Sequence, residues 1–284
     1  MPTILDDILT HKRAEVAEAK LRRPLQDLER DMASAPPVRD FRVALAPLQP
    51  GGPQGAAPPE APVGTGLAGA GIKVIAEIKR RAPSMKGVEL DLDIAQVVGA
   101  YERGGAAAIS VLTDQKYFGG SVEDLLTVKN ATGLPVLRKE FVIDPWQVYE
   151  ARVYGADAIL LIVRALSFVE LKELLSLTRR LGMCALVECH TAEELAAVPA
   201  EAEIIGINNR DLTNLQTDLA VTERLAPLVP PGKMLVSESG IKTADDIRRL
   251  ARTGRVNAVL VGAAVVSAQA MTEKIAELVH AVQS

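Results

Sequence analysis

Short apolar runs alternate with helical stretches along most of the chain. Eight runs rich in β-branched residues recur about every 20 to 30 residues. A helical stretch precedes each run, and several helical stretches end at a glycine turn such as Gly104-Gly105. The pattern predicts β-strands over residues 74–79, 107–113, 135–142, 158–163, 184–190, 203–209, 234–239 and 258–263.

These runs are too apolar to face water on one side, which indicates a parallel sheet covered by helices. Eight βα units in just over 200 residues are typical of a (β/α)₈ barrel. A doubly wound sheet should show a phosphate-binding GxGxxG after its first strand, and none occurs. We therefore predict an α/β fold with a TIM barrel over residues 72–284.

Two segments precede the predicted barrel. Over residues 4–31, apolar positions recur at helical spacing with a break at Pro24, which predicts two amphipathic helices. We expect residues 1–46 to form a helical extension that packs on the barrel. Residues 47–71 are crowded with proline and glycine and carry Glu60 as their only charge, so we expect a flexible, dispensable loop.

Composition and charge narrow the class of protein. Hydrophobic residues make up 48% and charged residues 24%, as in a folded globular chain. The formal net charge of −4 provides no basic field for nucleic acid, and no apolar run is long enough to predict a membrane span. The N-terminus alternates apolar and charged residues, unlike a secretory signal, so we expect a cytoplasmic protein. Cys184 and Cys189 would point to opposite faces of one strand, which predicts reduced thiols.

Polar side chains lie at the carboxyl ends of several predicted strands. In TIM barrels the chemistry lies at the carboxyl ends of the strands, where all of these side chains would meet. Any single one could be an ion pair that closes the barrel mouth. Two lysines and several carboxylates around one cavity, however, shift one another's pKa values and can move protons. The candidates are Glu77 and Lys79, Lys139 on the face of Leu137 and Phe141, Glu188 and His190, Asn208 with Arg210 just beyond it, and Glu238 with Ser239.

The turns after the last two strands point to an anion. Gly240 in SESGI and Gly262 in VGAA would let backbone N–H groups approach a phosphate, as TIM barrels often do at this place. We therefore expect a small phosphorylated ligand. Phe118, in KYFGGS, could line the mouth and stack on an aromatic ligand. His190 is either a hydrogen-bonding residue or a catalyst, and no His, Cys or Asp cluster has metal-ligand spacing, so we predict no metal.

Several of these motifs together resemble the indole-3-glycerol phosphate synthase family of tryptophan biosynthesis. The resemblance implies closure of 1-(2-carboxyphenylamino)-1-deoxyribulose 5-phosphate to indole-3-glycerol phosphate, with loss of carbon dioxide and water and without a cofactor. It also suggests other enzymes of that pathway as possible partners. The motifs are ILDDILTHKRAEV, IAEIKRRAPSMKG, ISVLTDQKYFGGS, VLRKEFVID, LVECH, IGINNRDL and SESGI.

The resemblance also implies roles for the candidate residues. Lys139 matches the general acid of the family, and Glu188 matches the carboxylate that assists proton removal and dehydration. Lys79, paired with Glu77, is implied to contact the carboxylate or phosphate of the substrate and to help in proton transfer. Asn208, which we also count among the catalytic candidates, and Arg210 match positions that orient substrate, and Glu238 and Ser239 match the pair at the end of the seventh strand. We expect Arg210, Glu238, Ser239, Phe118 and Phe141 to bind substrate.

Two positions depart from the pattern of the family, and both bear on the phosphate. Ala82 stands before Pro83 where the family usually has serine, and Ala263 follows Gly262 where a polar residue is usual. We therefore predict that backbone donors at Gly240, Gly262 and Ala263 hold the phosphate, helped by Lys79.

Two other functions stay open. One is another phosphosugar barrel enzyme, such as an aldolase that uses Lys139 as a Schiff-base nucleophile or a phosphoribosyl isomerase. The other is a non-catalytic barrel that binds a phosphorylated ligand, since a fold alone does not fix a function. A sensor, however, has no need of an acid and a base together, and Lys139 and Glu188 supply both.

Overall fold

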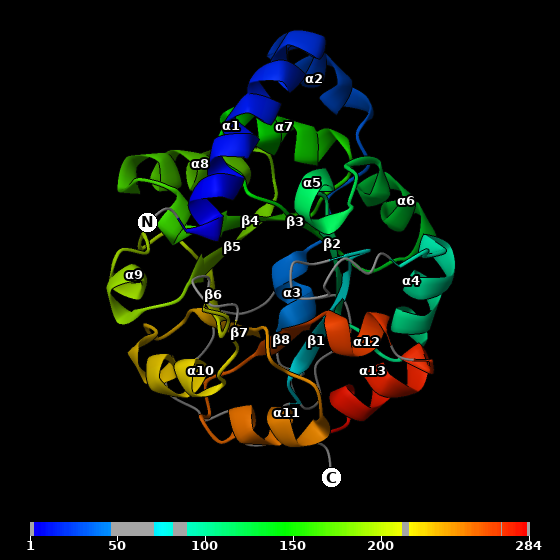
Figure 1. The fold of residues 1–284 in the computed structure, drawn as a ribbon, viewed down its shortest axis with the longest axis vertical. Helices are drawn as coiled ribbons and strands as arrows, with labels where there is room; N and C mark the ends of the chain where they lie inside the picture. Colours follow the sequence, from blue (N-terminus) through cyan, green and yellow to red (C-terminus); the bar gives the residue numbers. More distant parts are fainter. Residues whose placement is uncertain (1–2, 47–70, 82–89, 212–215, 268, 283–284) are drawn as a thin grey trace.

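A computed structural model describes residues 3–46, 71–81, 90–211, 216–267 and 269–282 (Figure 1). The predicted loop over residues 47–71 lies outside the described residues except for its last residue, and so does Ala82. Their predicted properties stay predictions from the sequence.

Eight parallel strands close into a barrel in which each strand pairs with its neighbours in sequence and β1 pairs with β8. The predicted TIM barrel is confirmed. β1 is shifted by one residue from its predicted run, and the other seven strands are shorter than theirs. Their bounds are β1 (Lys73–Ile78), β2 (Ala108–Leu112), β3 (Val136–Lys139), β4 (Ala158–Ile162), β5 (Cys184–Cys189), β6 (Ile204–Asn208), β7 (Met234–Glu238) and β8 (Ala258–Val261).

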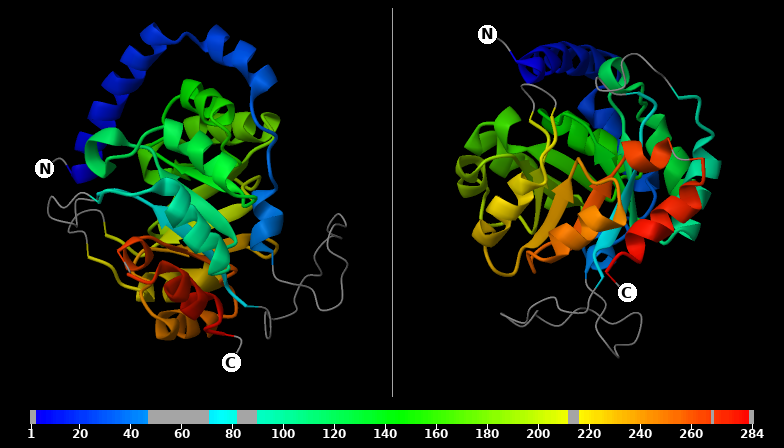
Figure 2. Two further views of the ribbon diagram at one scale, coloured as in Figure 1. Left: turned by 90° about the vertical axis from the view of Figure 1, so that its right-hand side faces the viewer. Right: turned by 60° about the horizontal axis from the view of Figure 1, so that its bottom comes forward.

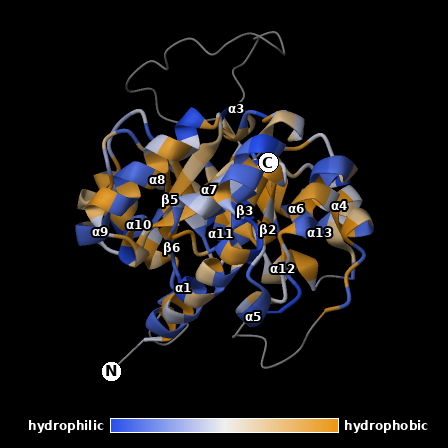
Figure 3. Ribbon diagram, turned by 90° about the horizontal axis from the view of Figure 1, so that it is seen from above, coloured by the Kyte–Doolittle hydropathy of each residue, from blue (hydrophilic) through white to orange (hydrophobic). Residues whose placement is uncertain are grey.

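Helices surround the strands on the outside of the barrel (Figure 3). Local sequence fixes where several of them begin: in α8, for example, Ser167 and Glu170 form a reciprocal capping box. The bounds are α4 (Ile94–Arg103), α5 (Gln115–Phe118), α6 (Glu123–Ala131), α7 (Pro145–Val153), η3 (Val163–Ala165), α8 (Phe168–Arg180), α9 (Ala192–Ala196), α10 (Ala220–Leu225), η4 (Ala226–Leu228), α11 (Ala244–Ala251), α12 (Ala263–Val266) and α13 (Met271–Val279).

The N-terminal extension runs along one side of the barrel (Figure 2, left). It consists of α1 (Ile4–Arg22), α2 (Leu25–Asp31), η1 (Met32–Ser34) and α3 (Phe41–Leu45), and the break at Pro24 is confirmed. The indole N–H of Trp146 in α7 donates to the carbonyl of Arg23 at 2.8 Å, which fastens the end of α1. At the far end of the extension, Phe41 and Leu45 are fully buried against the apolar residues inside the barrel.

The inside of the barrel changes from apolar to charged along the strands. Ile75, Leu137, Leu186 and Val236 share one apolar cluster, each from an odd-numbered strand. Side chains alternate along a strand, so the next inward position toward each carboxyl end is two residues further on. Those four positions hold Glu77, Lys139, Glu188 and Glu238. An aliphatic layer is therefore followed at the mouth by a layer built entirely of titratable groups.

Two further predictions concern the redox state of the cysteines and the presence of membrane-spanning helices. Cys184 and Cys189 are both free thiols, as predicted. Among the described residues, every helix is too short or too polar to cross a membrane.

Candidate active site

Lys139 lies at the centre of the charged layer. Its Nζ is 3.2 Å from Glu238 Oε2, 3.7 Å from Glu188 Oε2 and 4.0 Å from Glu77 Oε2. All four side chains are largely or fully buried. The structure thus confirms that these residues, which come from four different strands, converge at one point.

The electrostatics of this cluster keep the lysine charged. Burial would lower the pKa of Lys139, but Glu238, Glu188 and Glu77 outweigh that effect and raise it. Burial raises the pKa of Glu238, and the charge of Glu188 adds to the rise although Lys139 opposes it. A protonated ammonium therefore faces a carboxyl group whose pKa is raised. Such a pair can exchange protons with a bound substrate.

Lys79 forms a second ion pair beside the first. Its Nζ lies 2.6 Å from Glu77 Oε1 at the end of β1. Burial would raise the pKa of Glu77, but Lys79 and then Lys139 outweigh it and lower the pKa. Glu77 is therefore an ionised bridge between the two lysines.

A cavity opens over this cluster and is lined by both polar and apolar residues. The rings of Phe118 and Phe141 lie 6.2 Å apart between centroids, and both face the cavity, as predicted for Phe118. Three residues of α1 also line it, so the extension forms part of the wall. The apolar lining residues are Ile4, Leu5, Ile8, Leu112, Phe118, Phe141, Leu160 and Ile162, and the polar ones are Glu77, Lys79, Lys139, Glu140, Glu188, Asn208, Arg210 and Ser239.

The ends of β6 and β7 are fastened together at the mouth. The Asn208 side-chain carbonyl accepts from the backbone N–H of Arg210 at 3.0 Å. Asn209, which sequence reasoning missed, donates from Nδ2 to Ser237 Oγ and to the carbonyls of Glu238 and Ser239, each at 3.0 Å. Ser239 has a φ of 66°, a left-handed conformation uncommon for a non-glycine residue. The amide of Asn209 therefore supports the turn that presents Ser239 to the cavity.

Among the predicted phosphate residues, Lys79 lines the cavity, whereas Gly240, Gly262 and Ala263 are outside its lining. Gly240 has a φ of 85° and packs beside Thr217, and Ala263 is the exposed first residue of α12. A Cβ placed on Gly262 would lie 2.6 Å from Lys79 Nζ. The turn after β8 is therefore next to the lysine predicted to assist, and the phosphate site itself stays a prediction.

His190 is a hydrogen-bonding residue at the end of β5. Its Nδ1 lies 3.1 Å from Glu194 Oε2, and its Nε2 lies 3.5 Å from Glu188 Oε1. Burial would lower its pKa, but the hydrogen bond with Glu194 and the charge of Glu188 raise it. The first of its two predicted roles is thus confirmed. Among the described residues, no cluster of three or more His, Cys, Asp or Glu side chains is placed to hold a metal ion.

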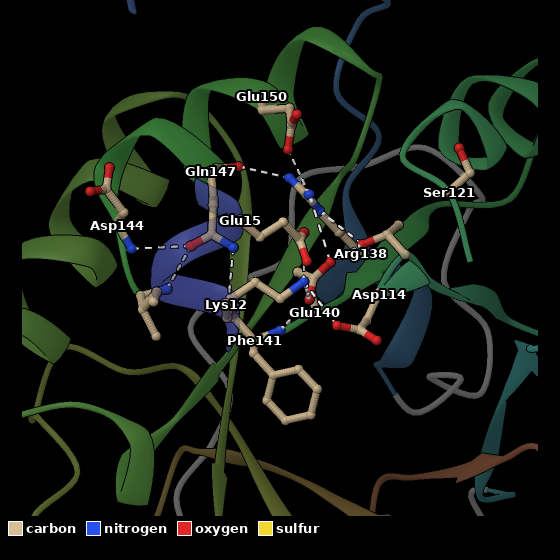
Figure 4. Close-up of polar contacts among 12 residues, drawn as sticks. Lys12, Glu15, Asp114, Ser121, Arg138, Glu140, Phe141, Asp144, Gln147 and Glu150 are labelled. Atoms are coloured by element: carbon tan, nitrogen blue, oxygen red, sulfur yellow. Dashed lines mark hydrogen bonds and ion pairs between the residues drawn. The ribbon is translucent and has the colours of Figure 1, made fainter. Parts of the chain in front are cut away.

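One fully buried charged residue near the cavity was not among the predicted site residues. Lys12 of α1 is fully buried and forms ion pairs with Asp114 and Glu140, the residue after Lys139 (Figure 4). One signal could have identified it: Ile8, Lys12 and Val16 are spaced four apart, so the lysine lies on the buried face of a helix.

Comparison with known sequences agrees with the motifs. Residues 64–278 match the family model described as indole-3-glycerol phosphate synthase. The chain is 48% identical to an indole-3-glycerol phosphate synthase of Dehalococcoides mccartyi (strain CBDB1), over 97% of this chain and 99% of that protein. It is 42% identical to the Kineococcus radiotolerans protein of the same name, over 98% of this chain and 96% of that one.

Solved structures with little sequence similarity share the barrel. Thiamine phosphate pyrophosphorylase from Pyrococcus furiosus aligns with a TM-score of 0.56 at 18% identity, over 75% of this chain and 96% of that chain. A 3-hexulose-6-phosphate synthase aligns with a TM-score of 0.59 at 13% identity, over 74% and 99%. At these identities the likeness shows the fold alone.

Proposed function

Because the chain belongs to the indole-3-glycerol phosphate synthase family, we propose that it closes 1-(2-carboxyphenylamino)-1-deoxyribulose 5-phosphate to indole-3-glycerol phosphate. It is accordingly a carboxy-lyase of tryptophan biosynthesis. The observation that carries the proposed mechanism is the position of Lys139, whose ammonium lies within 4.0 Å of three glutamates in the lining of the cavity or beside it.

Ring closure is the step that needs an acid. The aromatic carbon that bears the carboxylate attacks the ribulose carbonyl carbon, and the carbonyl oxygen must gain a proton as the new C–C bond forms. Lys139 donates this proton. The neighbouring glutamates raise its pKa, so the ammonium form predominates at neutral pH, and burial strengthens its interaction with a developing oxyanion.

Loss of carbon dioxide and water completes the indole ring. The bond to the carboxyl group breaks and its electron pair returns to the ring, which releases carbon dioxide. The new hydroxyl group then leaves with a proton as water, and a carbon-bound proton beside the nitrogen is removed. Glu188 takes that carbon-bound proton, and the overall reaction consumes one proton in place of the lost carboxylate. The position of Glu188 in the lining of the same cavity as Lys139 supports this role.

The remaining residues bind and orient the substrate. Phe118 and Phe141 provide an apolar surface for its aromatic ring. Asn208, Arg210 and Ser239, which also line the cavity, contact its polar chain. Lys79, held by Glu77, is the second cation for a substrate that carries both a carboxylate and a phosphate.

The phosphate is held mainly by backbone donors in the turns after β7 and β8. Gly240, Gly262 and Ala263 belong to these turns, and the position of Gly262 beside Lys79 supports the proposal. A cytoplasmic location and an association with other enzymes of the tryptophan pathway stay predictions from the sequence.

Turnover of the carboxyphenylamino-deoxyribulose substrate tests the proposed function. The purified protein should form a fluorescent indole product and carbon dioxide in equal amounts. Borohydride added during turnover should not label the protein, because labelling would indicate the Schiff base of an aldolase at Lys139. Binding of the substrate without either product would instead indicate a non-catalytic binding protein.

A further inference from the structure

The N-terminal helix α1 carries a buried positive charge that the proposed reaction does not use. Lys12 Nζ lies 2.9 Å from Asp114 Oδ2, 3.1 Å from Glu140 Oε1 and 2.9 Å from Glu15 Oε1 (Figure 4). Burial would lower the pKa of Lys12, but Glu140 and then Asp114 outweigh it and raise the pKa. The lysine is therefore charged, and removing it would leave the buried carboxylate of Asp114 without this cation, while Glu140 keeps a more distant cation in Arg138 at 3.9 Å.

Asp114 links Lys12 to one aromatic side chain of the cavity. It follows β2 and caps α5, where its Oδ1 accepts from the backbone N–H of Tyr117 at 2.7 Å. Phe118, the last residue of α5, lines the cavity. One carboxylate thus holds both the buried lysine and the short helix that presents Phe118.

Glu140 links Lys12 to the other aromatic side chain and to the proposed acid. It lies between Lys139 and Phe141, and its Oε1 accepts from the backbone N–H of Phe141 at 2.8 Å. Its Oε2 accepts from Thr113 Oγ1 at 2.8 Å. Gln147 Nε2 donates to the Phe141 carbonyl at 3.0 Å, so the segment is held from both sides (Figure 4).

The helix that carries Lys12 is itself part of the cavity. Ile8 lies one turn before Lys12 on the same buried face, and with Ile4 and Leu5 it lines the cavity. The ammonium of Lys12 therefore joins three separate parts of the wall: α1, the Phe118 helix and the Lys139–Phe141 segment.

We propose that Lys12 is a positioning residue for the reaction. It fixes these three parts relative to one another, so that the aromatic ring of the substrate meets Phe118 and Phe141 while its carbonyl meets Lys139. Lys12 does not itself line the cavity. This inference rests on the proposed function.

The chain offers a matched control in Lys20. Lys20 also lies on α1 and also joins it to the barrel, through an ion pair of 2.8 Å with Asp144, but the pair is partly exposed and lies outside the cavity lining. Lys20→Met therefore weakens the attachment of the extension without touching the wall. Lys12→Met removes a lysine from the same helix and takes its cation from Asp114 and Glu140, although Glu140 keeps Arg138 at 3.9 Å.

The test compares kcat and KM of the two variants at a temperature where circular dichroism shows both to be folded. We expect Lys12→Met to raise KM and lower kcat, each by about tenfold or more, because small displacements of positioned groups are costly. A loss of folded protein would lower kcat at unchanged KM, so the raised KM marks a positioning role. Lys20→Met should stay within about twofold of the unaltered protein in both constants, as expected for an exposed pair.

Amide hydrogen exchange without substrate provides a second readout that does not depend on the proposed function. Exchange at the Tyr117 and Phe141 amides should be faster in Lys12→Met and unchanged in Lys20→Met, because Asp114 and Glu140 accept from those two amides. If Lys12→Met does not fold, Asp114→Asn replaces it, since the amide oxygen can still cap Tyr117 while the charge facing Lys12 is lost. The same rise in KM is then expected.

Three results would overturn the proposal: unchanged kinetic constants in the folded Lys12 or Asp114 variant, equal losses in Lys20→Met, or unchanged exchange at both amides. If the unaltered protein has no activity toward the substrate, the proposed function fails, and the exchange experiment still decides whether Lys12 fixes the wall.

Discussion

Gly262 leaves the space that the carboxylate of Glu77 occupies. A Cβ on Gly262 would lie 2.2 Å from Glu77 Oε1 and 2.6 Å from Lys79 Nζ. Gly206 of β6 stands in the same relation to Glu238, whose Oε1 would lie 2.1 Å from a Cβ there. In both cases a glycine from an even-numbered strand or its turn makes room for a carboxylate from an odd-numbered strand. The charged layer of the barrel therefore requires glycine at these two positions as well as the titratable side chains themselves.

Gly262→Ala should impair activity more than stability. The new methyl group meets the ends of two side chains rather than backbone, and the φ of −118° at Gly262 is open to alanine, so the fold can adjust. Glu77 and Lys79 must move, however, and we expect kcat/KM to fall by about tenfold or more. Gly133→Ala is the control because a Cβ there has nothing within 4 Å. Equal kcat/KM in the two variants would contradict this account.

Ala263→Ser should strengthen the binding of the substrate phosphate. A hydrogen bond to a charged group contributes about 1.5 to 3 kcal/mol when well placed, which corresponds to a KM lower by roughly tenfold or more. A bridging water already in that position would reduce the gain. The measurement is KM together with inhibition by inorganic phosphate, with Ala196→Ser on α9 as an exposed control. If phosphate does not compete with substrate in any of these proteins, the anion site is not at these turns.

His190 should make stability depend on pH. Its pKa is raised above the value of 6.5 that holds in an unfolded chain, since burial, which lowers it, is outweighed by the hydrogen bond with Glu194 together with the charges of Glu188 and Glu194. Its contribution to the free energy of unfolding is therefore fully present below pH 6.5 and is lost as the pH rises through the folded-state pKa. Urea unfolding of the unaltered protein and of His190→Gln should show a difference that is larger at pH 6 than at pH 9. A difference that stays constant with pH would show that His190 acts by packing alone.

The barrel and its charged mouth could be predicted because strand alternation is a local rule. Once Leu137 is placed inside the barrel, Lys139 two residues later must also point inward, and the same argument places Glu188 after Leu186. The pairing of each strand with the next strand in the sequence follows from the regular recurrence of the βα units along the chain. The structure confirms both inferences.

Contacts between distant segments could not be predicted in this way. Helical spacing places Lys12 on a buried face but does not name its partners, which lie more than 100 residues away at Asp114 and Glu140. Helix α3 is too short to show periodicity, so nothing in the sequence indicates that Phe41 packs against the apolar residues inside the barrel. Gly262 was interpreted only as an anion-binding turn, because the Glu77 side chain that needs its space is on another strand.

The turnover number of Lys139→Met tests the central claim most directly. The substitution keeps the length of the side chain and removes the ammonium that three carboxylates hold in place. If Lys139 is the general acid, kcat should fall by about 10² to 10⁴ while circular dichroism shows an intact fold. Lys172→Met, which removes an exposed lysine of α8, should leave kcat unchanged. A folded Lys139→Met protein that turns over at nearly the normal rate would contradict the account.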